Sequence, residues 1–284
     1  MSKTYPNGVK ALDQVDLVLG AGMFGLLGPN GAGKSTLMRT LATLQDADAG
    51  TVRLGDLDVL RDKEAVRRTL GYLPQEFGLS PKARARDLLD TFAILKGITA
   101  RSDRAAIVDA LLHKTNLWDA RHQQLGGYSG GMRRRFGIAV ALIGDPKLII
   151  VDEPTAGLDP AERARFHNLL AEIGRDAVVL LSTHIVEDVA NLCPRMAVLH
   201  NGRIRLVGSP DDACARLAGR LWKRTVSHDE AAVLEATVPT ISTRLVGGRF
   251  EVRVVADGAP DGFVAAEPTL EDVYFAVTTG RWTP

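Results

Sequence analysis

Short apolar runs alternate with stretches of helical periodicity along most of this 284-residue chain. The apolar runs, rich in Leu, Ile and Val, predict strands over residues 15–19, 22–27, 148–151, 177–181 and 196–200. The stretches with helical periodicity predict helices over residues 34–44, 86–96, 104–115, 130–144, 160–173 and 185–192. Strands and helices in alternation are typical of an α/β fold with a largely parallel central sheet.

Two regions depart from this alternation. Residues 81–145 carry helical pattern almost throughout, which predicts an α-helical subdomain inserted into the sheet. The composition changes after residues 209–212, and the chain beyond them predicts a strand, a helix, a hairpin and a closing helix over residues 221–226, 229–236, 242–255 and 269–277. Gly247-Gly248 would supply the positive φ angles of the hairpin turn. We therefore expect a main domain over residues 1–210 and a small α+β appendage over residues 211–284.

Charge and composition narrow the classes of function. Lys and Arg number 35 against 34 Asp and Glu, and the only tight basic cluster is Arg133-Arg134-Arg135. A nucleic-acid groove needs a larger basic surface, so no nucleic-acid partner is expected. The apolar runs are far shorter than the roughly 20 residues that cross a bilayer, and the N-terminus lacks the apolar core of a signal peptide. Cys193 and Cys214 lack the spacing of metal ligands and are expected to be free thiols.

The segment Gly28-Pro29-Asn30-Gly31-Ala32-Gly33-Lys34-Ser35-Thr36 follows a predicted strand and opens a predicted helix. Its glycines allow backbone N–H groups to curl around phosphates, and the helix N-terminus adds the positive end of its dipole. Lys34 is expected to reach the β- and γ-phosphates, and the Ser35 hydroxyl to bind Mg²⁺. The nucleotide contacts predicted from this loop are Gly28, Asn30, Gly31, Gly33, Lys34, Ser35 and Thr36.

An acidic pair, Asp152-Glu153, directly follows the apolar run 148–151. Ligands bind at the carboxyl edge of a parallel sheet, and adjacent strand residues point in opposite directions, so the two carboxylates would have different tasks. We expect Asp152 to hold Mg²⁺ and Glu153 to orient and polarise the attacking water. An acidic pair alone is most often a solvated turn, but together with a phosphate loop it indicates nucleotide hydrolysis.

The motif Tyr128-Ser129-Gly130-Gly131-Met132 lies shortly before the acidic strand and has the form of a serine-capped helix start. With this motif in that place, residues 5–210 resemble the ATP-binding-cassette ATPases. The resemblance implies a P-loop NTPase core with an antiparallel β portion near the N-terminus. It also implies that Ser129, Gly130 and Gly131 clasp the γ-phosphate of an ATP molecule held by a second cassette.

The same resemblance assigns roles to residues elsewhere in the chain. Gln75, in Gly-Tyr-Leu-Pro-Gln-Glu, would contact Mg²⁺ and lie at the junction with a transmembrane partner. Asp159, which ends Ala-Gly-Leu-Asp, would lie in a loop at the interface between two cassettes. His184 would contact the γ-phosphate, and Tyr5 would stack on adenine. Glu153, His184 and Lys34 are thus the expected catalytic residues, and Ser35, Gln75 and Asp152 the expected metal ligands.

Two departures from the family's commonest pattern point to a subgroup. Tyr128 and Met132 replace the usual Leu and Gln of the motif, and Met-ending motifs occur among the exporter (ABC-2) ATPases of the drug and polysaccharide type. The tail Pro268-Thr269-Leu270-Glu271-Asp272-Val273-Tyr274 also resembles the tail of that group. The resemblance therefore implies an exporter with ATP and Mg²⁺ as cofactors, separately encoded transmembrane permease subunits, and a peripheral place on the cytoplasmic face of the cell membrane. It also implies a second cassette, with a homodimer favoured over a heterodimer.

Other protein classes share a phosphate loop. The alternative is a soluble cassette ATPase that acts on ribosomes, DNA or cofactor assembly. Translation-factor relatives usually carry two cassettes in one chain and chromosome-associated relatives carry long coiled coils, whereas this chain has one phosphate loop and no sustained heptad run. P-loop kinases and GTPases would leave Ser129-Gly130-Gly131 without a role. The appendage is compatible with strengthening the cassette dimer, with docking on the membrane partner, and with capping the sheet.

Overall fold

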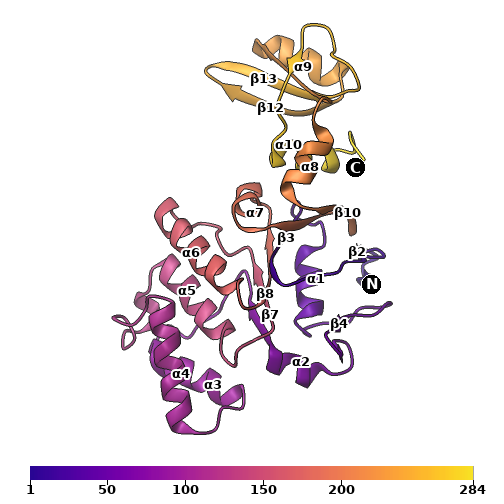
Figure 1. Cartoon of the computed structure of the whole chain (residues 1–284). Helices are drawn as coiled ribbons and strands as arrows, with labels where there is room; N and C mark the ends of the chain where they lie inside the picture. Colours follow the sequence, from indigo (N-terminus) through magenta and orange to yellow (C-terminus); the bar gives the residue numbers. More distant parts are fainter. Residues whose placement is uncertain (284) are drawn as a thin grey trace.

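A six-stranded sheet forms the centre of the structure, a computed structural model that describes residues 1–283 (Figure 1). Its strand order is β10-β9-β3-β8-β7-β6, and neighbouring strands run parallel except at the antiparallel β9–β10 pair. The strands span Gly22–Leu27 (β3), Leu70–Leu73 (β6), Leu148–Asp152 (β7), Val178–Thr183 (β8), Arg195–His200 (β9) and Arg203–Gly208 (β10). The predicted α/β fold with a largely parallel sheet is therefore confirmed.

The alternate residues of each central strand enter two separate cores, one on each face of the sheet. In β7, Leu148 and Ile150 belong to the core that contains residues of α1 (Lys34–Leu41) and α2 (Lys63–Thr69). Ile149 and Val151 belong to the opposite core. That core contains residues of α5 (Gly130–Ala141), α6 (Pro160–Ile173) and α7 (Val186–Leu192). Because both faces are apolar, polar side chains gather where the strands end.

The helices between β6 and β7 lie together on one side of the molecule (Figure 1). They have an apolar core of their own. They are α3 (Ala85–Leu95), α4 (Arg101–Lys114), the 3₁₀ turn η1 (Leu125–Gly127) and α5. Leu89 and Leu112 are fully buried in this core together with Phe136 of α5. Ile138 of α5 packs instead into the core of the central sheet. The inserted helical region that the pattern predicted is therefore present, and α5 is the helix that joins it to the sheet.

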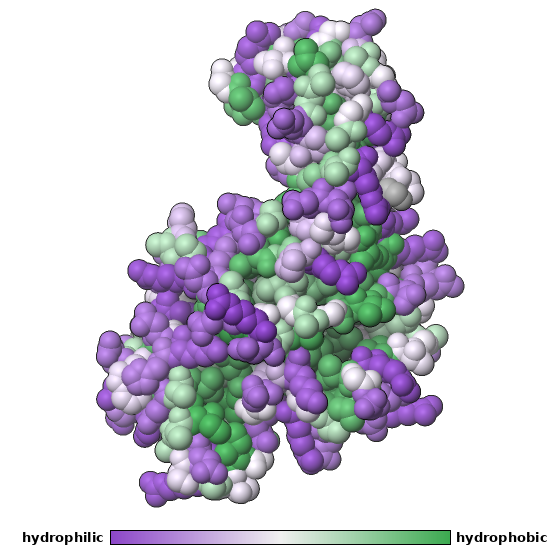
Figure 2. Space-filling view, viewed as in Figure 1, coloured by the Kyte–Doolittle hydropathy of each residue, from purple (hydrophilic) through white to green (hydrophobic). Residues whose placement is uncertain are grey.

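The C-terminal residues form a second sheet, which is antiparallel and has the order β12-β13-β11-β14. Its strands span Leu221–Val226 (β11), Thr240–Val246 (β12), Arg249–Val255 (β13) and Val264–Ala265 (β14), and α9 (His228–Thr237) packs on it. Gly247 and Gly248 have φ angles of 57° and 80°, so the predicted hairpin and its turn are confirmed. In the space-filling view this part stands away from the larger body across a narrower neck (Figure 2).

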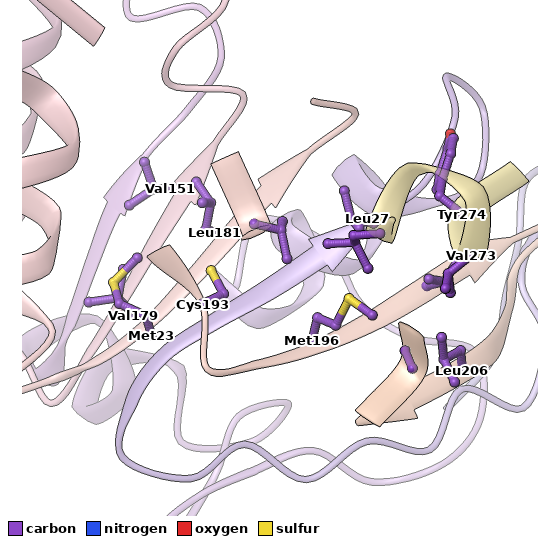
Figure 3. Close-up of a cluster of buried hydrophobic side chains, with 14 of the residues drawn as sticks. Met23, Leu27, Val151, Val179, Leu181, Cys193, Met196, Leu206, Val273 and Tyr274 are labelled. Carbon is purple, nitrogen blue, oxygen red and sulfur yellow. The ribbon is translucent and has the colours of Figure 1, made fainter. Parts of the chain in front are cut away.

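The helices α8 (Pro210–Leu217) and α10 (Leu270–Thr278) lie in this neck (Figure 1). Val273 and Tyr274 of α10 pack into the core of the central sheet beside Met196 (Figure 3). The carboxylate of Asp272, which is fully buried, accepts a hydrogen bond of 2.7 Å from Nη1 of Arg253 in β13. The tail motif thus joins the two parts, because its apolar side chains pack on one part while its aspartate binds the other.

The N-terminal residues differ in part from the prediction. β1 (Lys3–Thr4) pairs with β2 (Lys10–Leu12), and β4 (Arg53–Leu54) pairs with β5 (Leu57–Asp58), so the antiparallel β portion is confirmed. Residues 15–19, however, do not form a strand, and that prediction is wrong. Val15 exchanges backbone hydrogen bonds with Met1, but within residues 1–283 no neighbour continues a ladder along this segment. Apolar and polar residues alternate in this segment because Val15 is buried, and Leu17 and Leu19 are partly buried, against the core of the sheet. The alternation does not result from pairing with another strand.

Some helix ends also differ from the prediction. The helices expected to reach residues 44 and 144 end at Leu41 and Ala141, because Thr43 and Gly144 take positive φ angles that a helix does not accept. The sequence pattern did not predict α8, which begins after the Ser209 cap. Among residues 1–283, none of the helices combines the length and the apolar character needed to cross a bilayer.

Close backbone contact between α5 and β6 depends on Gly71. A Cβ atom at this position would lie 2.2 Å from the carbonyl oxygen of Ala141 and 3.0 Å from its carbon. Since both atoms are backbone, we expect Gly71→Ala to lower the free energy of unfolding by about 1–3 kcal/mol. Urea unfolding of the purified chain measures this change.

Gly258→Ala is the matched control, because a Cβ atom there meets no heavy atom within 4 Å. The control should unfold at the same urea concentration as the natural chain. Equal unfolding midpoints for Gly71→Ala and Gly258→Ala would contradict the packing described for α5.

Candidate functional site

The loop of residues 28–33 joins the end of β3 to the start of α1. Gly31 and Gly33 have φ angles of 78° and 106°, which side chains larger than glycine rarely accept. A Cβ atom at Gly33 would lie 2.3 Å from the carbonyl oxygen of Ala11, and one at Gly28 would lie 2.4 Å from that of Leu199. α1 begins without a side-chain cap, so its first N–H groups are available to an anion.

Lys34 is the first residue of α1 and joins this loop to the acidic strand. Its side chain is 6% exposed, and Nζ donates to the carbonyl oxygens of Gly28 (2.7 Å) and Pro29 (3.2 Å). Nζ also lies 3.5 Å from Oε1 of Glu153, which follows the last residue of β7. Lys34 of the phosphate loop and Glu153 of the acidic pair therefore form a buried ion pair.

Glu153 occupies a strained position between two predicted catalytic groups. Its φ angle is 49°, in the left-handed region that costs a non-glycine residue on the order of 1 kcal/mol. Its backbone N–H donates to the carbonyl oxygen of Ser182 at 2.9 Å, which holds this conformation. Oε2 of Glu153 lies 2.7 Å from Nδ1 of His184. Glu153 is thus placed with Lys34 on one side and His184 on the other.

Asp152 is the last residue of β7 and is 3% exposed. Burial raises the pKa of its carboxyl group, although the hydroxyl of Ser182, the charge of Lys34 and the hydroxyl of Ser35 each oppose the shift. One oxygen, Oδ1, has no hydrogen-bond partner in the described structure. Residues 1–283 contain no cluster of three or more His, Cys, Asp or Glu side chains suited to a metal ion. A single carboxylate beside a hydroxyl fits Mg²⁺, which takes its other ligands from phosphate and water.

A pocket of about 340 Å³ lies in front of these groups. Its lining includes predicted site residues from several separate segments of the chain: Tyr5, Asn30, Gly31, Gly33, Lys34, Ser35, Thr36, Gln75, Glu153 and His184. The hydroxyl of Tyr5 lies 3.1 Å from Oγ1 of Thr36 and donates to Oε1 of Gln45 at 3.2 Å. Val9 and Ala11 also line the pocket, and no residue pattern in the sequence marks them.

The remaining predicted contacts lie outside this pocket. Oγ of Ser129 accepts from the backbone N–H of Met132 (3.1 Å) as the cap of α5. Oδ1 of Asp159 accepts from the N–H of Glu162 (2.8 Å) as the cap of α6. Ser129, Gly130 and Asp159 are exposed, and neither they nor Gly131 line the pocket. The start of α5 is therefore separate from the pocket that the phosphate loop lines.

Asp188 of α7 is a fully buried carboxylate that sequence reasoning missed. Its Oδ2 accepts from the hydroxyls of Thr155 (2.5 Å) and Thr183 (3.4 Å). Its Oδ1 accepts from Nε of Arg163 (2.9 Å) and lies 2.8 Å from Nε2 of His167. Both basic residues are on α6, so Asp188 connects α6 and α7 with the ends of β7 and β8.

The hydrogen bonds of Asp188 hold the segments next to Glu153 and His184. Thr155 comes two residues after Glu153, and Thr183 directly precedes His184. Because both threonine hydroxyls donate to one buried carboxylate, Asp188 fixes the spacing between the segments that carry Glu153 and His184. The only sequence signal for this role would have been an acidic residue one helical turn beyond the histidine.

We expect Asp188→Ala to destabilise the fold by about 3–5 kcal/mol, because it leaves the side chains of Arg163 and His167 without their buried partner. The control is Glu187→Ala, which removes a 66% exposed partner of the same arginine and should cost about 1 kcal/mol or less. Chemical unfolding of both variants measures the difference. Equal losses of stability would show that the buried network is not important for the fold.

Comparison with known proteins places this geometry in a family. The family profile described as ABC transporter matches residues 12–156. The daunorubicin resistance ATP-binding protein DrrA3 of Streptomyces coeruleorubidus is 40% identical over 212 residues, which cover 74% of this chain and 67% of that protein. The Nod factor export ATP-binding protein I of Paraburkholderia xenovorans is 36% identical over 269 residues, with 90% and 87% covered. The chain spans about half (52%) of YbhF of Escherichia coli, a probable multidrug ABC transporter ATP-binding protein, at 29% identity.

Solved structures agree with these matches. An ATP-binding subunit of an ABC transporter superposes with a TM-score of 0.68 at 28% identity, covering 76% of this chain and 90% of that one. A dimer of the cassette MJ0796 in a post-hydrolysis state, bound to ADP and Pi, superposes with a TM-score of 0.66 at 26% identity, covering 73% and 95%. The phosphate loop, the acidic strand and the fold therefore have the same origin as theirs: this chain belongs to the ABC transporter family, as an ATP-binding-cassette ATPase.

Proposed function

We propose that this chain is the ATP-hydrolysing subunit of an export transporter and drives separately encoded transmembrane permease subunits from the cytoplasmic face of the cell membrane. The observation that carries the proposal is the arrangement of Lys34, Glu153 and His184 around one pocket, with Ser129 exposed elsewhere on the chain. The drug resistance and Nod factor export proteins among its relatives support export.

The pocket supplies contacts for each part of an ATP molecule. The phosphate loop and the start of α1 would hold the phosphates, with Lys34 moving from the carbonyls of Gly28 and Pro29 onto them. Tyr5, which lines the same pocket, would stack on adenine. Mg²⁺ would be held by Asp152, Ser35 and Gln75, and when bound it would neutralise charge on the phosphate oxygens.

The residues around Glu153 support hydrolysis rather than binding alone. Glu153 would accept a hydrogen bond from the attacking water and orient it toward the γ-phosphate. His184, 2.7 Å from Glu153, would hold that carboxylate in place and contact the γ-phosphate. Lys34 would stabilise the negative charge that develops on the transferred oxygens. Because the side chains of Lys34 and Glu153 are each 6% exposed, these interactions act with little screening by water.

The pocket would be completed by a second cassette. Ser129, Gly130 and Gly131 at the start of α5 would bind the γ-phosphate held by the partner, and Asp159 would lie at the same interface. One chain carries both halves of such a site, so two identical copies can form two complete sites with cyclic symmetry. This self-complementarity favours a homodimer over a heterodimer.

We assign residues 1–210 to the nucleotide-binding domain, with the helical subdomain at about 81–145, and residues 211–284 to an accessory domain. The apolar core of the sheet continues into α8 and α10, which supports α10 as the helix that carries the accessory sheet. A soluble role on nucleic acid is not favoured, because two of the three residues in the cluster Arg133-Arg134-Arg135 bind other parts of the chain.

For Glu153→Gln we expect ATP binding to persist while turnover falls about 10²–10⁴-fold, because the amide cannot accept the proton of the attacking water. A stable ATP-bound dimer should accumulate, which gel filtration with ATP measures. Glu64→Gln, at an 84% exposed side chain on α2, is the control and should keep normal turnover. Unchanged turnover in Glu153→Gln would remove Glu153 from the reaction.

The same tagged Glu153→Gln chain tests the transport proposal. Expressed in its native cell and extracted gently from membranes with ATP present, it should copurify with a polytopic membrane protein in near-stoichiometric amount. Ribosomal proteins, DNA or soluble assembly factors in place of a membrane partner would overturn the transport role and leave the ATPase chemistry standing.

A further inference from the structure

The basic cluster Arg133-Arg134-Arg135 lies in the first turns of α5, one residue after Ser129-Gly130-Gly131. Its members face different surroundings. Arg133 is exposed, and among residues 1–283 its side chain makes no hydrogen bond or ion pair, while its backbone N–H donates to the carbonyl oxygen of Ser129 within the helix. Arg134 and Arg135 are both at least half-buried and contact different neighbours. The cluster is therefore mainly an internal feature, and its contacts show what it connects.

Arg134 binds the loop that carries Gln75. Nη1 donates to the carbonyl oxygen of Gln75 at 2.7 Å and lies 3.5 Å from that of Pro74. Burial lowers the pKa of this guanidinium, while the charges of Asp152 and Glu153 raise it, so the group also lies in the field of the acidic pair. A guanidinium remains protonated throughout such shifts, so Arg134 is a fixed cation at this loop.

The packing below Arg134 leaves α5 little freedom to move independently of this loop. A Cβ atom at Gly137 would lie 2.4 Å from Cδ1 of Leu73 and 3.4 Å from Cδ1 of Phe77, on the two sides of Gln75 in the chain. Arg134, Gly137 and Ala141 are three and four residues apart, so they share one face of the helix. This face of α5 therefore contacts β6 and the following loop at three points, on both sides of Gln75.

An adjacent side of α5 is attached to α6. Nη1 of Arg135 donates to Oε2 of Glu162 at 2.7 Å, and the two side chains are 10% and 17% exposed. A Cβ atom at Gly131 would lie 2.1 Å from the same oxygen. Glu162 lies in the first turn of α6, which Asp159 caps. The start of α5 is therefore packed against the start of α6 and the loop that ends at Asp159.

We propose that Arg134 is a positioning residue that couples the two nucleotide sites of a cassette dimer. When the start of α5 binds the ATP held by a second cassette, Arg134 carries the resulting shift to Gln75 and so adjusts the metal site of its own chain. The inference rests on the proposed function, because it requires nucleotide sites that are shared between two cassettes. Coupling through Arg134 would make the rate of hydrolysis depend cooperatively on the ATP concentration.

The test compares Arg134→Ala with Arg133→Ala in the full chain. Arg134→Ala should lower turnover at saturating ATP by about tenfold to a hundredfold, as expected for loss of a hydrogen bond from a charged group. It should also raise the Mg²⁺ concentration needed for half-maximal turnover and bring the Hill coefficient for ATP toward 1. Fluorescent-ATP binding and the melting temperature should stay near those of the natural chain. Arg133→Ala, one residue away and exposed, should match the natural chain in every readout.

Arg134→Lys is the conservative variant and should recover part of the turnover and of the Mg²⁺ response, since an ammonium group can still donate to the Gln75 carbonyl. A purely structural role would lower the melting temperature in Arg134→Ala and leave the Mg²⁺ response and Hill coefficient unchanged, which would overturn the proposal. Hyperbolic turnover in the natural chain would overturn it as well. The ATP-dependent dimer of Glu153→Gln then shows whether the proposed function fails too, because that dimer does not depend on coupling.

Discussion

The nucleotide site depends on the fact that β3, β8 and β7 are adjacent parallel strands that end at one edge of the sheet. Each strand is buried on both faces, so its polar residues can emerge only after its last apolar residue. β3 is followed by the phosphate loop, β7 ends in Asp152 and is followed by Glu153, and β8 is followed by His184. Three segments far apart in the sequence therefore meet without any of them needing a long loop, and the buried carboxylate of Asp188 fixes two of them from behind.

The helix α5 gives the second constraint, because its side chains belong to two apolar cores at once. Its exposed start carries Ser129, while its body packs on β6 through glycine contacts and on α6 through Arg135. Contacts this close leave α5 little room to move independently of β6 and α6. The C-terminal sheet is attached differently, through a single neck in which α10 supplies both the apolar packing and the buried Asp272.

Much of this arrangement could be predicted from the sequence, because several motifs indicate a local conformation without any knowledge of distant contacts. The glycines of the phosphate loop and of the hairpin allow positive φ angles, and the apolar run before Asp152 indicates a buried strand. The predicted residues Tyr5, Gln75 and His184 depended on a family resemblance, and the structure brings them to one pocket. Their roles with ATP and Mg²⁺ remain predictions.

The errors and omissions have a common cause. Residues 15–19 alternate like a strand because their side chains are buried on one side, but sequence pattern carries no information on whether a neighbouring strand is present. Asp188 and Arg134 were missed because each acts through contacts with residues distant in the sequence, and a single acidic or basic residue in a helix has no distinctive pattern. Val9 and Ala11 also line the pocket, and neither belongs to a motif that the sequence pattern marks.

If each nucleotide site is shared between two chains, a mixture of two inactive variants should recover ATP hydrolysis. Lys34→Ala removes the phosphate-loop cation, and Ser129→Arg blocks the start of α5. A mixed dimer contains one site with both elements intact only if the elements come from different chains. We expect the mixture to hydrolyse ATP faster than the sum of the two variants assayed separately. A mixture no faster than that sum, with mixed dimers confirmed by differential tags, would contradict the shared site.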